Sequence, residues 1–269
     1  MKISPNFLEI YISGSTGFIG TNLCKFLKKK KIKIHLLSRD HLTGSKKFEL
    51  RKDSICIHLA GENDIKKINN DKNFVKESDQ YLSLLHKKGF KKIIYISSAY
   101  VYDDKIKSAH SEDEKIKVKD NYSLLKINAK KILEENGHCI LRVGNIYGNG
   151  MRKNIFIDVF NQIREPKVVL NSYSEIRDYV FIDDVITLIY KLLKCDYHGV
   201  FNVGTGVGTN VRQLVDKILT AFDLDTFPEI VFLREGRKSS LILDISKASS
   251  LLNWKPKYQL ENGLKKVLI

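Results

Sequence analysis

The sequence predicts an α/β fold in which a doubly wound parallel sheet is followed by a small α/β C-terminal lobe. Three observations carry this prediction. Short apolar runs alternate with amphipathic helical stretches along the first half of the chain. A glycine-rich turn lies between the first apolar run and the first helical stretch. The chain has 269 residues, of which 43% are hydrophobic, and this is enough for a large core.

The first half contains five apolar runs of strand length and three helical stretches. Strands are expected at residues 8–12, 32–37, 55–60, 92–97 and 139–144, and helices at residues 17–30, 74–88 and 121–135. Because right-handed crossovers join parallel strands, this order gives a doubly wound sheet.

The second half is less regular. Helices are expected at residues 154–164, 185–193 and 211–222, short strands at residues 168–170, 200–203 and 230–233, and a last helix starting at Asp244. The stretch 211–222 is clearest, because its apolar residues recur at helical spacing. Residues 108–120 are charged without periodicity and are expected to form a surface loop.

The glycine turn has the sequence context of a nucleotide site, because it follows a strand and opens a helix. Gly14 permits the tight turn, Gly17 lets the backbone approach a pyrophosphate, and Gly20 lets the helix pack close to the sheet. The helix N-terminus offers free N–H groups and a positive dipole end. This predicts a Rossmann-type dinucleotide site with cofactor contacts at Gly14, Thr16, Gly17, Phe18, Ile19 and Gly20.

The residues after the second strand bear on the choice between NADP and NAD. An acidic residue at this point usually binds the adenosine ribose of NAD, whereas an Arg accommodates the 2′-phosphate of NADP. Ser38 stands where the acid is expected and Arg39 follows it. The pattern favours NADP, with NAD as the alternative if Asp40 serves the ribose.

Tyr122 and Lys126 form a Y-x-x-x-K pair one helical turn apart, so both side chains lie on one face. A nearby ammonium lowers the pKa of a tyrosine, which otherwise lies near 10. Tyr122 is therefore expected to exchange a proton with a sugar oxygen while a nicotinamide gives or takes a hydride. Ser98 closes the fourth strand, at the edge where such sheets bind ligands, and is expected to hydrogen-bond the same oxygen.

Composition limits the other classes of function. The chain carries 46 Lys and Arg against 31 Asp and Glu, a net charge of +15, but only nine of the 46 are Arg and the lysines are scattered. A net positive charge favours solubility and association in general and does not by itself indicate a nucleic-acid site. We therefore do not expect nucleic acid as a partner. No apolar run reaches membrane-spanning length, and we expect no signal peptide before the first strand. The four cysteines fit no metal spacing, so we expect no metal site. We expect the thiols to be buried and the protein to be cytoplasmic.

Five segments follow one another in an order that is typical of one family. They are GSTGFIG at residues 14–20, IHLAG at 57–61, SSAYVY at 97–102, LRVGNIYG at 141–148 and RDYVFIDDV at 177–185. Together with Tyr122 and Lys126 they resemble the extended short-chain dehydrogenase/reductase family, in its branch of nucleotide-sugar epimerases, dehydratases and ketoreductases. The resemblance covers nearly the whole chain.

The resemblance implies several further site residues and a partner. Cofactor contacts are implied at Ser38, Arg39, Leu59, Ala60, Gly61, Ser97, Tyr122, Lys126 and Val143. Substrate contacts are implied at Ser98, Asn145, Arg177 and Arg234, with both arginines on the diphosphate of a nucleotide sugar. Asp183 and Asp184 are expected to cap the helix that follows them. The family commonly forms homodimers through the helices expected here at residues 74–88 and 121–135.

Departures from the family pattern narrow the expected reaction. Ala99 and Tyr100 stand where sugar dehydratases carry an Asp-Glu pair, so dehydration is not expected. Arg237 stands where some uridine-diphosphate enzymes carry an acid, which argues against that nucleotide. The first expectation is an NADPH-dependent reductase of a 4-keto sugar on a nucleoside diphosphate. A 4-epimerase with tightly bound NAD⁺ uses the same residues, and a non-catalytic cofactor-binding regulator is the third alternative.

The resemblance also implies two parts of the chain with different roles. Residues 1–150 are expected to form the dinucleotide-binding domain with the catalytic Tyr122 and Lys126. Residues 151–269 are expected to form mainly the substrate-binding lobe, with some segments returning to the first domain.

Overall fold

The computed structural model describes residues 9–43, 50, 51, 53–134, 137–152, 154–222 and 227–267. Leu8 and Glu135, which the sequence placed at a strand start and a helix end, lie outside these residues. No helix in the described part of the chain is long and apolar enough to cross a membrane. The chain divides into two compact units, which are described separately. The first comprises Met1–Val101, Lys115–Arg142 and Ile186–Phe201, and the second Tyr102–Glu114, Val143–Val185 and Asn202–Ile269.

The first unit is built around a six-stranded sheet with the order β2-β1-β3-β4-β5-β9. Its strands are β1 (Ile10–Ser13), β2 (Ile34–Leu37), β3 (Ile55–His58), β4 (Lys92–Ser98), β5 (Cys139–Val143) and β9 (Gly199–Val203). The pairs β1–β2, β1–β3 and β3–β4 are parallel. The strand order reverses at β1, so its carboxyl end is the switch point at which open α/β sheets bind ligands. The predicted doubly wound sheet is confirmed.

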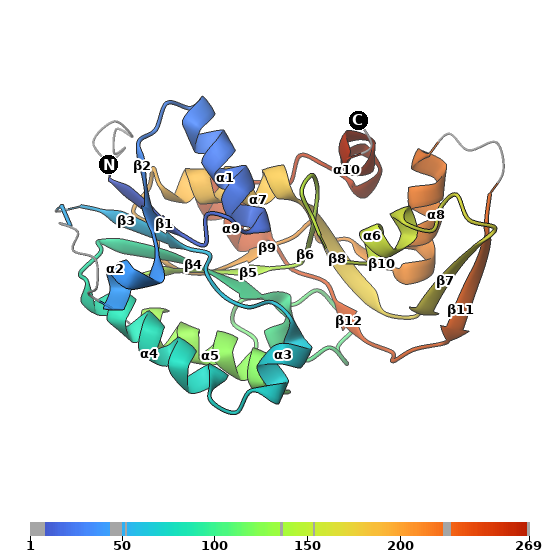
Figure 1. Cartoon of the computed structure of the whole chain (residues 1–269), viewed down its shortest axis with the longest axis horizontal. Coiled ribbons are helices and arrows are strands. Elements are labelled where there is room, and N and C mark those ends of the chain that lie inside the picture. Colours follow the sequence, from blue (N-terminus) through green and yellow to red (C-terminus); the bar gives the residue numbers. More distant parts are fainter. Residues whose placement is uncertain are drawn as a thin grey trace. The chain divides into compact units, whose positions relative to one another are not determined.

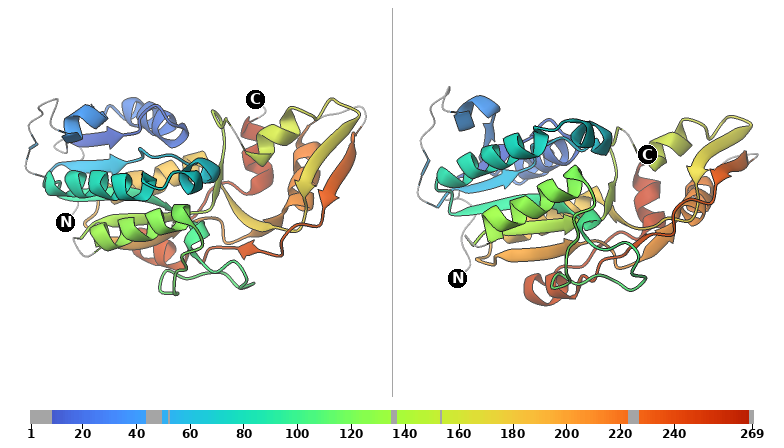
Figure 2. Two further views of the ribbon diagram at one scale, coloured as in Figure 1. Left: turned by 60° about the horizontal axis from the view of Figure 1, so that its bottom comes forward. Right: turned by 90° about the horizontal axis from the view of Figure 1, so that it is seen from below.

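Helices cover both faces of this sheet (Figure 1). One face carries α1 (Phe18–Lys29) and the part of α7 (Ile182–Leu192) that belongs to the first unit. The other face carries α4 (Phe74–Lys87) and α5 (Asn121–Glu134), which run side by side (Figure 2). The short helices α2 (Arg39–Thr43) and α3 (Ile65–Asn70) follow the second and third strands.

Burial of regularly spaced apolar side chains holds these helices on the sheet. Leu23 and Leu27 of α1 and Leu82 and Leu85 of α4 are almost fully buried, each pair at helical spacing. Each such side chain contributes about 2 kcal/mol on leaving water. This packing fixes the carboxyl ends of β1, β3 and β4, on which the candidate site is built.

The second unit has its own small sheet. Its central strand β8 (Ile176–Phe181) pairs with β10 (Gly208–Asn210), β12 (Ser240–Leu241) and β6 (Asn145–Tyr147). A separate parallel pair consists of β7 (Lys167–Ser172) and β11 (Glu229–Arg234). The unit also contains α6 (Ile155–Phe160), α8 (Val211–Ala221), α9 (Ser246–Leu252) and α10 (Leu260–Val267). A capping box of Asn210 and Gln213 starts α8.

Most differences from the sequence prediction lie in the second half. The strand β8 escaped prediction because its apolar and polar residues do not alternate, and the polar Asp178 is buried. The helix expected at 154–164 ends at Phe160. In the loop 108–120, His110 is fully buried and its ring stacks on Tyr102. All four cysteines are free, but Cys24 and Cys195 are only partly buried.

The expected helix cap at Asp183 and Asp184 is wrong in its geometry. Helix α7 begins at Ile182, so both aspartates lie in its first turn. The Asp184 carboxylate accepts the backbone N–H groups of Lys257 and Tyr258, at 2.9 and 3.0 Å. Asp184 therefore fastens the segment before α10 to the start of α7.

Candidate active site

The glycine turn has the shape that a pyrophosphate requires. Gly14 has a positive φ of 70°, and a Cβ there would lie 2.5 Å from the backbone N of Ala60. A Cβ on Gly20 would collide with the Gly14 carbonyl oxygen. Within α1, which is described throughout, no side chain caps the N-terminus and the first turn has no acidic residue. The first N–H groups of the helix thus remain available to an anion.

A buried hydrogen bond of Ser13, the residue before the turn, stabilises the turn. The Ser13 hydroxyl lies 2.7 Å from Nδ1 of His58, and it is 3.3 and 3.4 Å from the backbone N atoms of Leu59 and Ala60. Burial lowers the pKa of His58 to about 4, so its imidazole is neutral. The predicted cofactor contacts at Leu59 and Ala60 therefore lie directly against the glycine turn. Gly61 follows them with open space around its Cα.

The residues after β2 lie beside the glycine turn, because Leu37 pairs with Ser13. The Ser38 backbone N and hydroxyl lie 3.0 and 2.8 Å from Nδ1 of His41. The Arg39 guanidinium lies over the Tyr81 ring, 5.7 Å from its centroid. The sequence interpretation missed His41, because a single histidine in a polar stretch carries no pattern.

Ser98, Tyr122 and Lys126 come together at the carboxyl end of β4. Ser98 is the last residue of this strand, and Tyr122 and Lys126 lie in the first two turns of α5. A side-chain hydrogen bond joins Ser98 to Tyr122. The Lys126 ammonium lies 5.7 Å from the centroid of the Tyr122 ring. The three predicted catalytic side chains thus form one group, with Ser97 preceding them in the strand.

The surroundings of Tyr122 keep its phenol protonated. Burial raises the pKa of Tyr122, the hydrogen bond from Ser98 lowers it, and the Asp120 carboxylate raises it, so that the net effect is a raised pKa. The ring of Tyr100 packs edge-on against Tyr122 with centroids 5.7 Å apart, and its hydroxyl donates to Asp120 at 3.2 Å. In the protein alone, Tyr122 is therefore a proton donor.

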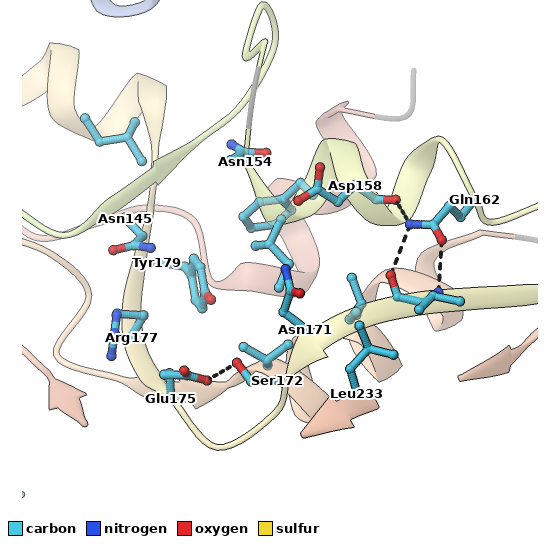
Figure 3. A pocket seen from close by; sticks show the side chains of 16 residues that line it. Asn145, Asn154, Asp158, Gln162, Asn171, Ser172, Glu175, Arg177, Tyr179 and Leu233 are labelled. Atoms are coloured by element: carbon cyan, nitrogen blue, oxygen red, sulfur yellow. Dashed lines mark hydrogen bonds between the residues drawn. The ribbon is translucent and has the colours of Figure 1, made fainter. Parts of the chain in front are cut away.

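The second unit contains a cavity of about 720 Å³ whose lining includes two predicted substrate contacts, Asn145 and Arg177 (Figure 3). It lies among β7, β8 and α6 and is lined by both polar and apolar side chains. Two of its polar groups are already engaged, because the Ser172 hydroxyl donates to Glu175 at 2.7 Å and Gln162 bonds the Val169 backbone. Asn145 is exposed at the start of β6.

Arg177 is the cation of this cavity. Its guanidinium donates to the Ile176 carbonyl at 2.7 Å and to the Ser239 hydroxyl at 2.9 Å. Burial lowers the pKa of this guanidinium, which nevertheless remains charged. No carboxylate of the described residues forms an ion pair with Arg177. A partly buried guanidinium with neutral partners can bind a phosphate or another anion.

The next residue, Asp178, is a structural centre of the second unit. Its carboxylate accepts the backbone N and the hydroxyl of Thr205, both at 2.7 Å, and the backbone N of Gly206 at 2.9 Å. It also accepts the backbone N of Leu243 at 3.3 Å. Asp178 thus ties β8 to two distant loops and fixes the strand that carries Arg177.

The two predicted diphosphate arginines differ in their relation to the cavity, because Arg177 lines it, whereas Arg234 pairs with the lining residue Ser172. Arg234 ends β11 and is exposed, and it does not line the cavity. Arg237, three residues later, forms an ion pair with Asp104, and both of these charges act on Arg177. The segment Arg234-Glu235-Gly236-Arg237 offers two arginines, and only tertiary contacts distinguish them. Val143, a predicted cofactor contact, ends β5 in the second unit.

No cluster of His, Cys, Asp and Glu side chains in the described part of the chain could hold a metal ion.

Comparisons with known proteins identify the family. The model of the NAD dependent epimerase/dehydratase family matches residues 10–204. The dTDP-4-dehydro-6-deoxyglucose reductase of Escherichia coli is 31% identical over 199 residues, which are 68% of this chain and 62% of that relative. A putative UDP-glucose 4-epimerase of Methanocaldococcus jannaschii is 26% identical over an alignment of 304 positions, which covers 96% of this chain and 97% of the relative.

Solved structures show the same fold. A UDP-glucose 4-epimerase from Thermotoga maritima with UDP-glucose has a TM-score of 0.81 at 24% identity, covering 97% of each chain. RMD from Pseudomonas aeruginosa complexed with NADPH has a TM-score of 0.80 at 22% identity, again over 97% of each chain.

The fold and the family match define an enzyme of the extended short-chain dehydrogenase/reductase type that works with a nicotinamide cofactor. The chain belongs to the NAD-dependent epimerase/dehydratase family.

Proposed function

We propose that this enzyme reduces the 4-keto group of a sugar carried on a nucleoside diphosphate, with NADPH as the preferred cofactor. The observation that carries the proposal is the Ser98–Tyr122 hydrogen bond beside Lys126, at the carboxyl end of the parallel sheet. The similarity to a dTDP-4-dehydro-6-deoxyglucose reductase supports this choice of reaction.

Each residue of the group has a separate role in this reaction. Bound NADPH supplies the hydride that reaches the carbonyl carbon. Tyr122 donates its phenolic proton to the carbonyl oxygen, and Ser98 hydrogen-bonds and orients that oxygen. The Lys126 ammonium stabilises the tyrosinate that remains and binds the nicotinamide ribose.

The neutral phenol of Tyr122 suits the reducing direction. A reductase needs the neutral phenol at the start of the chemical step, whereas an epimerase must first remove a proton from a sugar hydroxyl. Burial raises the pKa of Tyr122, so its phenol is neutral at pH 7. The proton donor is thus ready without a prior ionisation.

The cofactor assignment is supported by the groups around the glycine turn. The turn and the first N–H groups of α1 fit a pyrophosphate, with Gly14, Thr16, Gly17, Phe18, Ile19 and Gly20 as contacts. Ser38 and Arg39 follow β2, and Ser38 stands where an NAD enzyme usually has a carboxylate. Their proposed role is to bind the 2′-phosphate of NADP, for which Arg is suited.

The nucleotide part of the substrate is assigned to the second unit. Arg177 is proposed as the diphosphate contact, since it is a guanidinium with neutral partners lining a cavity. Asn145 and Arg234 are proposed as further contacts of the same substrate. The relatives described above include a reductase of a dTDP-linked sugar and a UDP-glucose 4-epimerase.

A 4-epimerase that retains NAD⁺ is the alternative. It is favoured by the similarity to a putative UDP-glucose 4-epimerase over nearly the whole of both chains. Such an enzyme oxidises C4 and reduces it from the other face with the same tyrosine.

Identification of the released nucleotide separates the two reactions. The purified protein is denatured and its supernatant analysed by mass spectrometry, and the untreated protein is titrated with NADPH and NADH. A reductase is expected to release no stoichiometric nucleotide and to bind NADPH more tightly. Stoichiometric NAD⁺ contradicts the reductase and supports the epimerase.

A kinetic test addresses the substrate. With a 4-keto nucleotide sugar and NADPH, Arg177→Gln is expected to raise KM at least tenfold, because a charge-assisted contact to the diphosphate is lost. The same change at Arg212, whose guanidinium lies over the rings of Tyr173 and Phe232, is the control and is expected to leave KM within twofold. An unchanged KM for the Arg177 variant contradicts the assignment.

We also propose that two copies pair through α4 and α5. A groove on these helices includes Leu84, which is 41% exposed, and Leu124. Leu84→Glu is expected to halve the mass measured by sedimentation if this face is the dimer contact. The free cysteines are consistent with a cytoplasmic protein, which remains a proposal.

A further inference from the structure

The ammonium of Lys126 has two acceptors, and both come from adjacent residues of β4. It donates to the Ile96 carbonyl oxygen at 3.0 Å and to the Tyr95 phenol oxygen at 3.3 Å. The same ammonium lies 5.0 Å from the centroid of the Tyr95 ring. Tyr95 therefore offers Lys126 both an oxygen and an aromatic face.

The other groups around Lys126 do not neutralise it. Among the described residues, no carboxylate forms an ion pair with this lysine. Tyr122 on α5 and His58 on β3 both face it, and both are neutral at pH 7. Asp79 on α4 acts electrostatically on Tyr95, while its own carboxylate accepts from Asn128 at 2.6 Å. Hydrogen bonds to neutral oxygens thus hold the cation in place.

Tyr95 is itself held firmly. Only 6% of its surface is exposed, and its ring stacks on His58 with centroids 5.8 Å apart and planes 18° apart. His58 is in turn bonded to Ser13, which precedes the glycine turn. A phenol fixed in this way presents its oxygen to Lys126 without losing further side-chain entropy.

We propose that Tyr95 is a positioning residue of this enzyme, whose phenol oxygen holds the Lys126 ammonium beside Tyr122 and stabilises its charged form. Tyr95 acts through Lys126 and touches neither substrate nor cofactor in this role. The inference rests on the proposed function only for the catalytic role of Lys126.

The physical reason lies in the burial of the lysine. Burial without a counter-ion lowers the pKa of Lys126 to about 8, which is close to neutral pH. Loss of one hydrogen bond to the ammonium lowers this pKa further, by about one unit for a long bond such as this. A neutral Lys126 would no longer stabilise the tyrosinate form of Tyr122.

The test is Tyr95→Phe, which removes the oxygen and keeps the ring against His58 and Lys126. Tyr11→Phe is the matched control, because Tyr11 lies on β1 of the same sheet with 5% exposure and packs on His35 and Phe90. The pKa of Lys126 is measured in each protein by competitive labelling with acetic anhydride across pH, with peptide mass spectrometry as the readout. This measurement needs no substrate.

The expected result is a Lys126 pKa about one unit lower in Tyr95→Phe and unchanged in Tyr11→Phe. The alkaline limb of the kcat profile is expected to move to lower pH by the same amount, with partial rescue in Tyr95→His, which keeps a hydrogen-bonding ring nitrogen. An unchanged Lys126 pKa in Tyr95→Phe overturns the proposal. If the 4-keto nucleotide sugar is not the substrate, the wild type will not turn it over, but the labelling result will be unchanged.

Discussion

Replacement of Lys126 by Met is expected to stabilise the folded protein at pH 7 while it abolishes turnover. The lysine is a buried cation whose two acceptors, Tyr95 and Ile96, are neutral. Met has a similar length and brings no charge into the site. Functional sites often contain groups that lower the stability of the fold but are needed for activity.

The size of the effect follows from the pKa of Lys126. Folding lowers this pKa from 10.5 to about 8. A shift of about 2.5 units corresponds to about 3.4 kcal/mol against the folded state at pH 7. Loss of the two hydrogen bonds offsets part of this gain, so the net stabilisation by Met is expected to be about 2 kcal/mol.

The sign of the pH dependence can be worked out directly. Below pH 8, both the folded and the unfolded wild type carry the ammonium, and the folded state bears the full cost. Between about pH 8 and pH 10.5, the unfolded chain binds a proton that the folded chain does not, so the stability of the wild type rises with pH. Met binds no proton, so its advantage over the wild type shrinks across this window.

The assay is urea unfolding of both proteins at pH 7, 8, 9 and 10. The difference between the two unfolding free energies removes contributions from all other titrating groups. Lys131→Met, a change of an exposed lysine on the same helix, is expected to alter stability by less than about 0.5 kcal/mol at every pH. A difference between wild type and Lys126→Met that stays constant from pH 7 to pH 10 refutes the reasoning.

Three further predictions concern the turn, the tyrosine and the second unit. Tyr122→Phe is expected to lower kcat by about 10²–10⁴-fold while cofactor affinity, measured by fluorescence titration, changes little; unaltered turnover would contradict catalysis by Tyr122. Gly14→Ala is expected to weaken cofactor binding by at least tenfold in the same titration, because its Cβ meets Ala60, whereas Gly89→Ala, at an equally positive φ in open space, should cost only stability. Asp178→Asn is expected to cost about 2–4 kcal/mol in thermal unfolding, since its amide NH₂ must face backbone N–H groups, and a loss no greater than that of the half-exposed Asp183→Asn would argue against this.

The local features of the site could be predicted from the sequence. A strand, a glycine turn and a helix lie within residues 10–29, so one short segment is enough to predict all three. Tyr122 and Lys126 share a helix face because four residues separate them. Ser98 was predicted from its place at the end of an apolar run, which the structure shows as β4. Short-range spacing is sufficient for such inferences, since helix and strand periodicity fixes side-chain direction.

Contacts between distant segments were decided only by the tertiary structure. The Tyr95 oxygen reaches Lys126 from 31 residues away, and the Arg237–Asp104 ion pair spans 133 residues. Asp178 is a buried hub because loops at residues 205 and 243 converge on it. The sequence shows which of these residues are polar or aromatic, but the choice of partner depends on how the sheet and loops pack. Local periodicity therefore determined the elements and the catalytic pair, and long-range packing determined the hydrogen bonds that surround them.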